Sequence, residues 1–588
     1  EKGVSRLRHT LTAAIFFYST LAAAYTPSLT PSGLPVRWSR PKINLAGNPS
    51  NQNGLSYKQV FDGIVHSLMR WNESSAGSVK FDYWQGTDPN TYIPNSDYNG
   101  LSSIYFASSV NGPSGVSPNV LGLTQVWYDT QNGEILEADT VLNDQDFIFT
   151  TNPTNTSGPG SGGATYINGR AAVFLENVVT HELGHSFGLS HSGALQATML
   201  FMESPEQAHL GCDDTTAIRA LYPSSGVSTQ STISGSVVTP SYAPVFGAQV
   251  VAISRRRGTV LATALTDRSG HYTLSALEAG TYFILVEPYF PGSQTLSAYY
   301  AGSTSYVCPK GQSFGRTFLM DFSGRFPAGV EVAAGATSQA PTLVAQCGGS
   351  GSTLPQLGGS TQLAGAPEMM GPDTKGLGFG AVDWSFERTT QYYKLSEVSG
   401  HLEIHALSYG MYSPIRSQLS LLDASGRAVG SQISNPVYSS ESGFKDFDTS
   451  LIAEVSPGNY YVAVTSSYLV SDFYPAGSLG MDSTPFVLLT GSINEGAAPS
   501  APILPMNSHC RMPENFSAYA SPPGEPPRTD IQGGFGFCGT VRSQVRSDRQ
   551  GNTPISEVVG WFLPLGLAWV IPHIAKRRRT RSYLAHEA

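Results

Sequence analysis

The stretch VVTHELGHSFGLSHS, residues 178–192, constrains the fold of this chain most, because its spacing predicts a helix and the point where that helix ends. Residues four apart lie on one helix face, so His181 and His185 point the same way, one turn apart. If the helix continued, His191 would lie about 240° further round and face away. Gly188 removes this conflict, because glycine readily adopts the left-handed conformation that ends helices. The stretch therefore predicts three convergent imidazoles.

Three imidazoles that meet at one point indicate a zinc site. Zinc takes neutral histidine nitrogens as ligands and, in a hydrolase, keeps a fourth position for water. The predicted metal ligands are His181, His185 and His191. Glu182 follows the first ligand and lies within reach of that water, as a general base requires, so it is the predicted catalytic residue.

A second type of zinc site takes a downstream glutamate as its third ligand. In this chain Glu203 and Glu206 are the candidates. That alternative leaves Gly188 and His191 without a role, so the three-histidine site is the favoured interpretation.

The pattern H-E-x-x-H-x-x-G-x-x-H resembles the metzincin zinc site, and further residues narrow the resemblance. Met199 lies eight residues after His191, where matrixins, the matrix-metalloproteinase-like branch, place the methionine of a structural turn beneath the metal. HELGHSFGLSHS, with Ser192 after the third histidine, looks like the matrixin site, and LGCDDTTAIRALYP resembles the closing matrixin helix. VRWSRPKINLA and GEILEADTVLN are similar to the early strands of bacterial matrixin-like enzymes. The likeness covers residues 35–223 and implies a zinc endopeptidase acting on protein or peptide substrates.

Some features depart from the matrixin pattern. Leu200 and Phe201 follow Met199 where matrixins usually have Tyr or Asn and then Pro, so the floor of the specificity pocket is not predicted. No cysteine precedes Cys212, which argues against latency through a cysteine switch. The loop that binds a structural zinc in animal matrixins is not recognisable. Calcium is a further candidate cofactor, with Asp139, Asp144 and Asp146 as its candidate ligands and loop solvation as the alternative role of these residues.

Length and composition predict several β-rich domains. The chain has 588 residues, too many for one core, and only 13% are charged while 62 are Gly and 39 are Pro. A net charge of −9 argues against nucleic acid as a partner. The predicted fold is multidomain: an α+β metzincin catalytic domain with a mixed sheet and an active-site helix, then two β-sandwich domains and a C-terminal apolar segment.

Hydrophobic periodicity places the elements of the first domain. Helices are expected over residues 56–73, from about 169 to 185, and over 213–222. Strands are expected over residues 36–46 and 101–110, with a hairpin over 121–143 that turns at residues 131–133. By analogy with the family, a strand near the site, within SSIYFASSV (residues 102–110), is expected to bind an extended peptide substrate by edge pairing.

The later domains are predicted from turn-rich, β-branched sequence. TDRSGHYTL and LEAGTYFILV, within residues 266–286, resemble the carboxypeptidase-regulatory-like sandwich, and residues 379–492 look like jelly-roll domains of secreted bacterial peptidases. The predicted boundaries are 1–24 for a signal peptide, 25–224 for the protease domain, 230–347 for the first sandwich, 348–365 for a Gly/Ser-rich linker, 366–493 for the second sandwich, 494–554 for a flexible stalk and 555–588 for a transmembrane or sorting segment with a basic tail.

The two ends predict export and attachment to a membrane. Lys2, Arg6 and Arg8 precede an apolar run and a small-residue A-x-A pattern at residues 22–24, as in a secretory signal. The run VVGWFLPLGLAWVIPHIA, residues 558–575, is long enough to span a bilayer and is followed by KRRRTR. A buried helix is the alternative, but its two prolines disfavour it. The protein is therefore expected to be secreted or held at the cell surface, with the membrane as a partner through this segment.

The five cysteines are few for this length and odd in number, and the sequence does not fix their connectivity. Proximity favours the pairs Cys308–Cys347 and Cys510–Cys538, which leaves Cys212 over.

Two functions are compatible with these features of the sequence. The first is a secreted or surface-tethered zinc endopeptidase in which Glu182 acts as general base and then general acid. The alternative is a catalytically silent adhesin or scaffold whose β-sandwich domains do the binding. A decayed protease often loses its base or a ligand, and here all four residues are present, which favours the enzyme.

Overall fold

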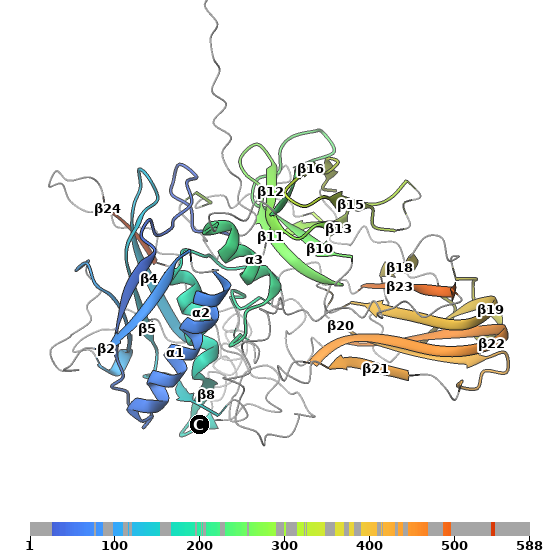
Figure 1. The fold of residues 1–588 in the computed structure, drawn as a ribbon, viewed down its shortest axis with the longest axis horizontal. Helices are drawn as coiled ribbons and strands as arrows, with labels where there is room; N and C mark the ends of the chain where they lie inside the picture. Colours follow the sequence, from blue (N-terminus) through green and yellow to red (C-terminus); the bar gives the residue numbers. More distant parts are fainter. Residues whose placement is uncertain are drawn as a thin grey trace, which may run out of the picture.

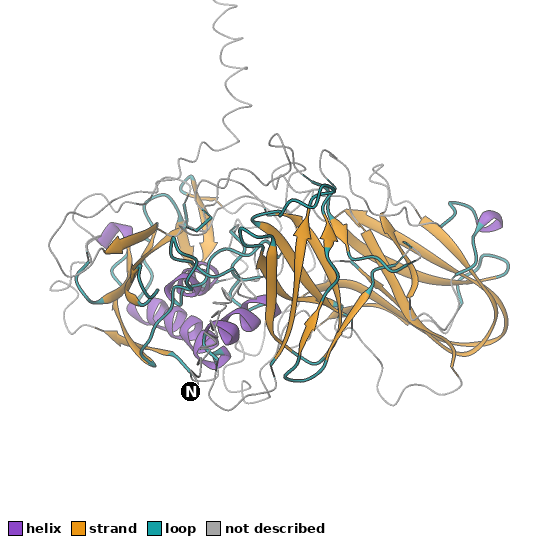
Figure 2. Ribbon diagram, turned by 90° about the horizontal axis from the view of Figure 1, so that it is seen from above, coloured by secondary structure: helices purple, strands orange, loops and turns teal. Residues whose placement is uncertain are grey.

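The structure is a computed structural model in which three β-rich parts follow one another (Figure 1). It describes residues 26–75, 78–85, 98–109, 116, 120–152, 166–194, 197–201, 203, 207–223, 230–255, 258–289, 299–300, 314–322, 324, 326–346, 359–369, 376–381, 390–408, 413, 415–429, 433–438, 445–468, 486–495 and 542–546. Figure 2 draws helices of every kind in purple, and the α-helices of this described portion all belong to the first part. The chain is thus multidomain and mostly β, as expected.

The first part is built on a six-stranded mixed sheet with the order β2-β1-β3-β5-β4-β24. Four neighbouring strands run parallel: β1 (Lys42–Asn48), β2 (Lys80–Gln85), β3 (Ser102–Phe106) and β5 (Ile135–Leu142). Strand β4 (Gly122–Asp129) runs antiparallel to β5, and Gly133, with φ of +76°, lies in the turn that joins them. This confirms the predicted hairpin. The short 3-10 helix η1 (Ala107–Ser109) follows β3.

Three α-helices complete this part, and two of them match the predicted positions. They are α1 (Tyr57–Ser74), α2 (Leu175–Ser186) and α3 (Cys212–Leu221). Ser56 caps α1 through a capping box with Gln59, which explains why the helix begins there. Trp71 of α1, Leu183 of α2 and Phe81 of β2 are buried in one apolar cluster that joins helices and sheet.

The predicted start of the active-site helix, at about residue 169, is wrong. Residues Arg170–Phe174 form β8, which pairs with β7 (Tyr166–Ile167) and β6 (Ile148–Thr150), and α2 begins only at Leu175. The reason is the tight turn between β7 and β8, where Asn168 and Gly169 both have positive φ, 52° and 78°. Such a turn joins antiparallel strands and cannot be the first turn of a helix.

The prediction that a strand within residues 102–110 binds substrate by edge pairing is also wrong. Strand β3 lies inside the sheet, paired with β1 on one side and β5 on the other. Strand β4 lies further out, and residues Arg542–Arg546 pair with it in parallel as β24. These five residues fall within the predicted flexible stalk of residues 494–554, which stays a prediction for the rest of that range.

The second part consists of two sheets around one core, as expected for a β-sandwich. One sheet contains β10 (Ala248–Ser254), β11 (Thr259–Leu265), β13 (Gly280–Pro288), β14 (Thr317–Phe318) and β15 (Gly329–Val332). The other contains β9 (Ser231–Val238), β12 (His271–Leu277), β16 (Thr337–Gln339) and β17 (Leu343–Val344). Ile233 of β9 and Val250 of β10 belong to the same buried cluster.

The third part is a single six-stranded antiparallel sheet among the described residues. Its strands are β18 (Gly376–Ala381), β19 (Thr390–Leu407), β20 (Ile415–Asp423), β21 (Ile433–Tyr438), β22 (Lys445–Tyr468) and β23 (Phe486–Glu495). The short 3-10 helix η3 (Leu363–Gly365) precedes them. Register shifts near Val398 interrupt the long β19–β22 ladder, which is where such strands bend. The jelly-roll-like sandwich stays a prediction, because two separate sheets are not distinguished.

The terminal predictions fall outside the described residues. Neither residues 1–24 nor the apolar run of residues 558–575 is among them. Within the described portion, no helix is both long and apolar enough to cross a membrane.

Cys212 is bonded in a disulfide. Its partner must be one of the other four cysteines, all of which lie outside the described residues. Cys212 is therefore not left over as predicted, while the predicted pairs Cys308–Cys347 and Cys510–Cys538 fall outside the described residues.

Candidate metal centre

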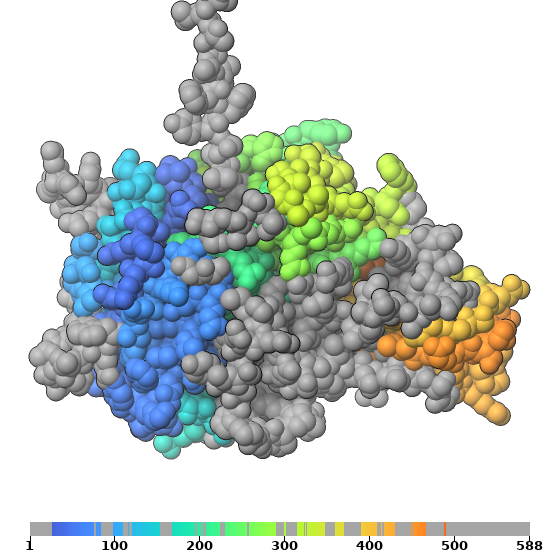
Figure 3. Space-filling model, viewed as in Figure 1, coloured from blue at the N-terminus to red at the C-terminus, as the bar shows by residue number. Residues whose placement is uncertain are grey.

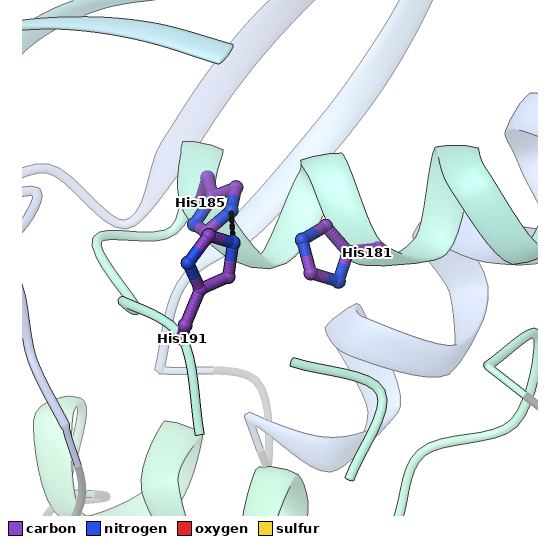
Figure 4. Close-up of side chains that lie close together, drawn as sticks. All are labelled: His181, His185 and His191. Atoms are coloured by element: carbon purple, nitrogen blue, oxygen red, sulfur yellow. Dashed lines mark hydrogen bonds between the residues drawn. The ribbon is translucent and has the colours of Figure 1, made fainter. Parts of the chain in front are cut away.

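The three predicted ligands come together at the end of α2 (Figure 4). One nitrogen of each of His181, His185 and His191 lies within 4.8 Å of the others. The Nε2 atoms of His185 and His191 are 3.2 Å apart. When the His, Cys, Asp and Glu side chains of the described residues are considered together, these three histidines are the cluster arranged to hold a metal ion.

Backbone carbonyls orient the two helical histidines. The Nδ1–H of His181 donates to the carbonyl of Thr198 at 2.7 Å, and that of His185 donates to the carbonyl of Leu189 at 2.9 Å. When Nδ1 carries the proton, Nε2 has a free lone pair, so each of the two rings presents Nε2 to the shared centre as a metal ligand.

Burial keeps these two histidines in the neutral form that binds metal. The exposed fraction is 0% for His181 and His185 and 3% for His191. Burial lowers the pKa of His181 well below its usual value, and the nearby His185 lowers it further. Burial also lowers the pKa of His185 to about 4. Neither ring therefore carries a proton on both nitrogens at neutral pH.

The residues present fit a zinc ion. The Nε2 atom of His181 is buried and has no hydrogen-bond partner in the protein, a state that costs free energy unless a ligand satisfies it. Three neutral imidazole nitrogens are a known ligand set for catalytic zinc. The donor set, its burial and this orphaned nitrogen thus agree.

Gly188 ends α2 as predicted and turns His191 toward the centre. Its φ is +97°, and a Cβ at this position would overlap the carbonyl oxygen of Val36. The N–H of Leu189 donates to the carbonyl of Gly184 at 3.0 Å, which closes the last turn of the helix. Both the backbone conformation and the available space therefore require glycine here.

Met199 packs beneath the metal-binding helix, as the resemblance implied. Gly184 lies between His181 and His185 in the sequence, and a Cβ at this position would overlap the Met199 sulfur. The absence of a side chain at Gly184 therefore allows the methionine to pack closely against α2. Asp214 of α3 holds this turn by accepting from the N–H groups of Thr198 and Met199, at 2.6 and 3.0 Å. The turn and the first ligand are thus linked, because Thr198 also accepts from His181.

Glu182 is buried beside the ligands, and two residues of β4 position its carboxylate. The hydroxyl of Thr124 lies 2.7 Å from Oε2 of Glu182. A Cβ at Gly122 would lie 2.9 Å from Oε1, so this glycine leaves room for the carboxylate. Sequence reasoning missed both, since they are 58 or more residues away from Glu182 and no local pattern marks them.

The alternative zinc ligand Glu203 is not part of the cluster. Its Oε1 accepts from the side-chain amide of Asn177 at 2.8 Å, and burial raises its pKa to about 7. Glu206 lies outside the described residues. The three-histidine prediction is therefore the one that the geometry supports. Phe201, one of the two residues that depart from the matrixin pattern after Met199, packs with its ring centroid 6.4 Å from that of His191.

The calcium prediction is not supported. Asp144 accepts from the N–H groups of Gln52 and Ser108, at 2.9 and 2.8 Å, so it ties two segments together and is not solvated. Asp146 accepts from the side chain of Asn143, and Asp139 accepts from Ser103. The described residues gather no calcium-binding group around these carboxylates.

Asp139 has an effect on stability that depends on pH. Burial, and then the charge of Glu137, raise its pKa to about 8. The folded state therefore holds a proton that the unfolded state releases above about pH 4, and stability falls as pH rises through this window. The Asp139→Asn variant has no such proton to lose.

We expect the free energy of unfolding of Asp139→Asn, relative to the parent, to increase from pH 5 to pH 8, by at most about 1.4 kcal/mol per pH unit. Urea unfolding at several pH values measures this. Parallel pH profiles for the two proteins would contradict the assignment, because they would mean that Asp139 is not the titrating group.

Comparison with known families agrees with this geometry. Residues 51–223 match the matrixin family, and residues 232–305 match the carboxypeptidase regulatory-like domain. No curated protein matches the chain closely enough to count as a relative. The matrixin match indicates a zinc metallopeptidase, and the described residues carry the histidine triad that this requires. The chain thus contains a matrixin-like metalloprotease domain followed by a carboxypeptidase-regulatory-like β-sandwich.

Proposed function

We propose that this protein is a secreted or surface-tethered zinc endopeptidase. The observation that carries the proposal is the convergence of three buried imidazoles next to an intact Glu182. The signal-like N-terminal sequence and the apolar run of residues 558–575 support export and a tether.

The chemistry follows from the residues around the centre. A zinc ion held by His181, His185 and His191 supplies a Lewis acid for the scissile carbonyl and lowers the pKa of a bound water. Glu182 accepts a proton from the attacking water and passes it to the leaving amine, so it acts as base and then as acid. The Thr124 hydroxyl holds the Glu182 carboxylate in one orientation during both transfers.

The substrate class is protein or peptide. The strand that contacts the catalytic carboxylate of Glu182 is β4. Gly122 and Thr124 of β4 touch the side chain of Glu182, so an extended chain that pairs with this end of β4 passes the catalytic carboxylate. Strand β24 pairs with residues Gln125–Asp129 and leaves Gly122–Thr124 out of its register.

The test is cleavage of casein by the purified full chain before and after removal of metal. We expect a chelator to abolish cleavage and added Zn²⁺ to restore it, because water activation depends on the bound ion. His185→Ala should stay inactive after Zn²⁺ is added, and His271→Ala, a change at an exposed position of the sandwich, should behave like the parent.

Two results would contradict the proposal. Cleavage that is insensitive to chelation would exclude a metal mechanism. Full zinc occupancy without cleavage of casein or of a diverse peptide library would instead favour the silent adhesin or scaffold.

A further inference from the structure

We propose that the β-sandwich is a working part of the metal centre, because it holds the loop that carries the third ligand. Residues 191–194, here called the third-ligand loop, lie between the protease part and the sandwich. In the space-filling view the blue-to-green protease part and the green-to-yellow sandwich adjoin (Figure 3). The proposal rests on the zinc site of the proposed function and adds positioning residues from a second domain.

The first contact runs through a buried carboxylate shared by both parts. Asp213, in the first turn of α3, accepts from the hydroxyl of Ser192 at 2.5 Å. The same carboxylate accepts from the N–H of Thr263 in β11 at 2.7 Å and from its hydroxyl at 3.0 Å. All three residues are buried. Thr263 therefore holds the Asp213 carboxylate in place, and Asp213 in turn holds Ser192, the residue next to His191.

The second contact is a chain of buried polar groups that ends on the loop. The N–H of Gly193 donates to Oε1 of Gln249 in β10 at 3.2 Å. The amide nitrogen of Gln249 donates to Glu287 of β13 at 2.9 Å, and Glu287 accepts from Arg316 at 3.0 Å. The Glu287 carboxylate thus sets the orientation of the amide, which leaves its oxygen facing the loop.

The third contact reaches the ligand residue itself. The hydroxyl of Tyr289, which follows β13, donates to the carbonyl of His191 at 3.3 Å. Cys212, the residue before Asp213, is buried in the apolar core of the sandwich. Sandwich residues therefore reach His191, Ser192 and Gly193, three consecutive positions of one loop.

These contacts concern the metal because His191 has no helix to hold it. His181 and His185 are fixed by α2, whereas His191 lies beyond the turn at Gly188. A ligand must be held to within about 0.5 Å of its place for full affinity, and residues outside the ligand set contribute about 10- to 100-fold. The sandwich supplies part of that restraint for the third ligand, beside the hydrogen bond that the N–H of Ser192 donates to the carbonyl of Met199 at 2.8 Å. Thr263, Gln249 and Tyr289 are thus positioning residues.

The experiment measures Zn²⁺ affinity of the full chain by competition with a chelating dye, independently of any protease assay. We expect Thr263→Val, which removes the hydroxyl and keeps the shape, to weaken Zn²⁺ binding about tenfold. Thr263→Ser keeps a hydroxyl and should restore most of the affinity.

A matched control separates positioning from stability. Thr266 is also buried in the sandwich, where its hydroxyl donates to the carbonyl of Val245 at 2.6 Å, so Thr266→Val removes a comparable bond away from the loop. We expect Thr266→Val to lower the urea midpoint but to bind Zn²⁺ like the parent. With Co²⁺ in place of Zn²⁺, the visible absorption bands should change for Thr263→Val and not for Thr266→Val.

Each outcome decides a different question. Parent-like Zn²⁺ affinity of Thr263→Val, or equal losses in the two valine variants, would overturn the proposed role of the sandwich. Should Thr263→Val not fold, Thr263→Ser compared with Gln249→Leu decides instead, since only loss of the loop contact should weaken binding. A parent chain that binds no Zn²⁺ would overturn the proposed function and this inference with it.

Discussion

Replacing Glu182 with glutamine is expected to lower kcat/KM by about 10²- to 10⁴-fold while zinc stays bound. Glutamine keeps the size of the side chain and still accepts the hydrogen bond from Thr124, but it cannot take a proton from water. Peptide hydrolysis and metal content, measured on the same sample, test this expectation.

Glu203→Gln is the matched control for this prediction. Glu203 is equally buried, close in sequence, and bonded to Asn177 outside the metal centre, so activity should be close to that of the parent. If Glu182→Gln kept more than about a tenth of the activity, general base catalysis by Glu182 would be wrong.

Gly188→Ala is expected to cost both stability and zinc affinity. An alanine at φ of +97° costs about 1–2 kcal/mol in backbone energy, and its Cβ would also overlap the Val36 carbonyl. The turn must shift to relieve this overlap, and His191 shifts with it. We therefore expect Zn²⁺ affinity to fall at least about tenfold, measured by dye competition, with a lower urea midpoint.

Gly169→Ala separates the two causes. Gly169 also has a positive φ, 78°, but a Cβ there would meet nothing within 4 Å. This variant should lose about 1 kcal/mol of stability and bind Zn²⁺ normally. Equal affinities for the two alanine variants would show that the turn at Gly188 does not position His191.

The metal ligands were predictable from sequence because the information is local. Within eleven residues, helix geometry relates His181 to His185, and one glycine explains how His191 returns. The hairpin at Gly133 and the helix that follows Ser56 are local in the same sense, and both are confirmed.

The errors arose where local patterns met a tertiary constraint. The apolar residues before α2 fit a helix, yet the turn at Asn168 and Gly169 makes them a strand. The strand order of the sheet is not written in any one strand, so β3 was taken for the edge. Thr124 and Thr263 carry no motif, because their roles depend on partners 58 and 50 residues away.

Helix α3 limits how the protease domain and the sandwich can be separated by engineering. Its residues Ala217, Ile218 and Leu221 belong to the protease core, while Cys212 at its start belongs to the sandwich core. The predicted boundary at residue 224 therefore follows a helix that both cores share. The two domains therefore have to be transferred together. If another domain replaced the sandwich after α3, the start of this helix at Cys212 would lose the apolar core against which it packs.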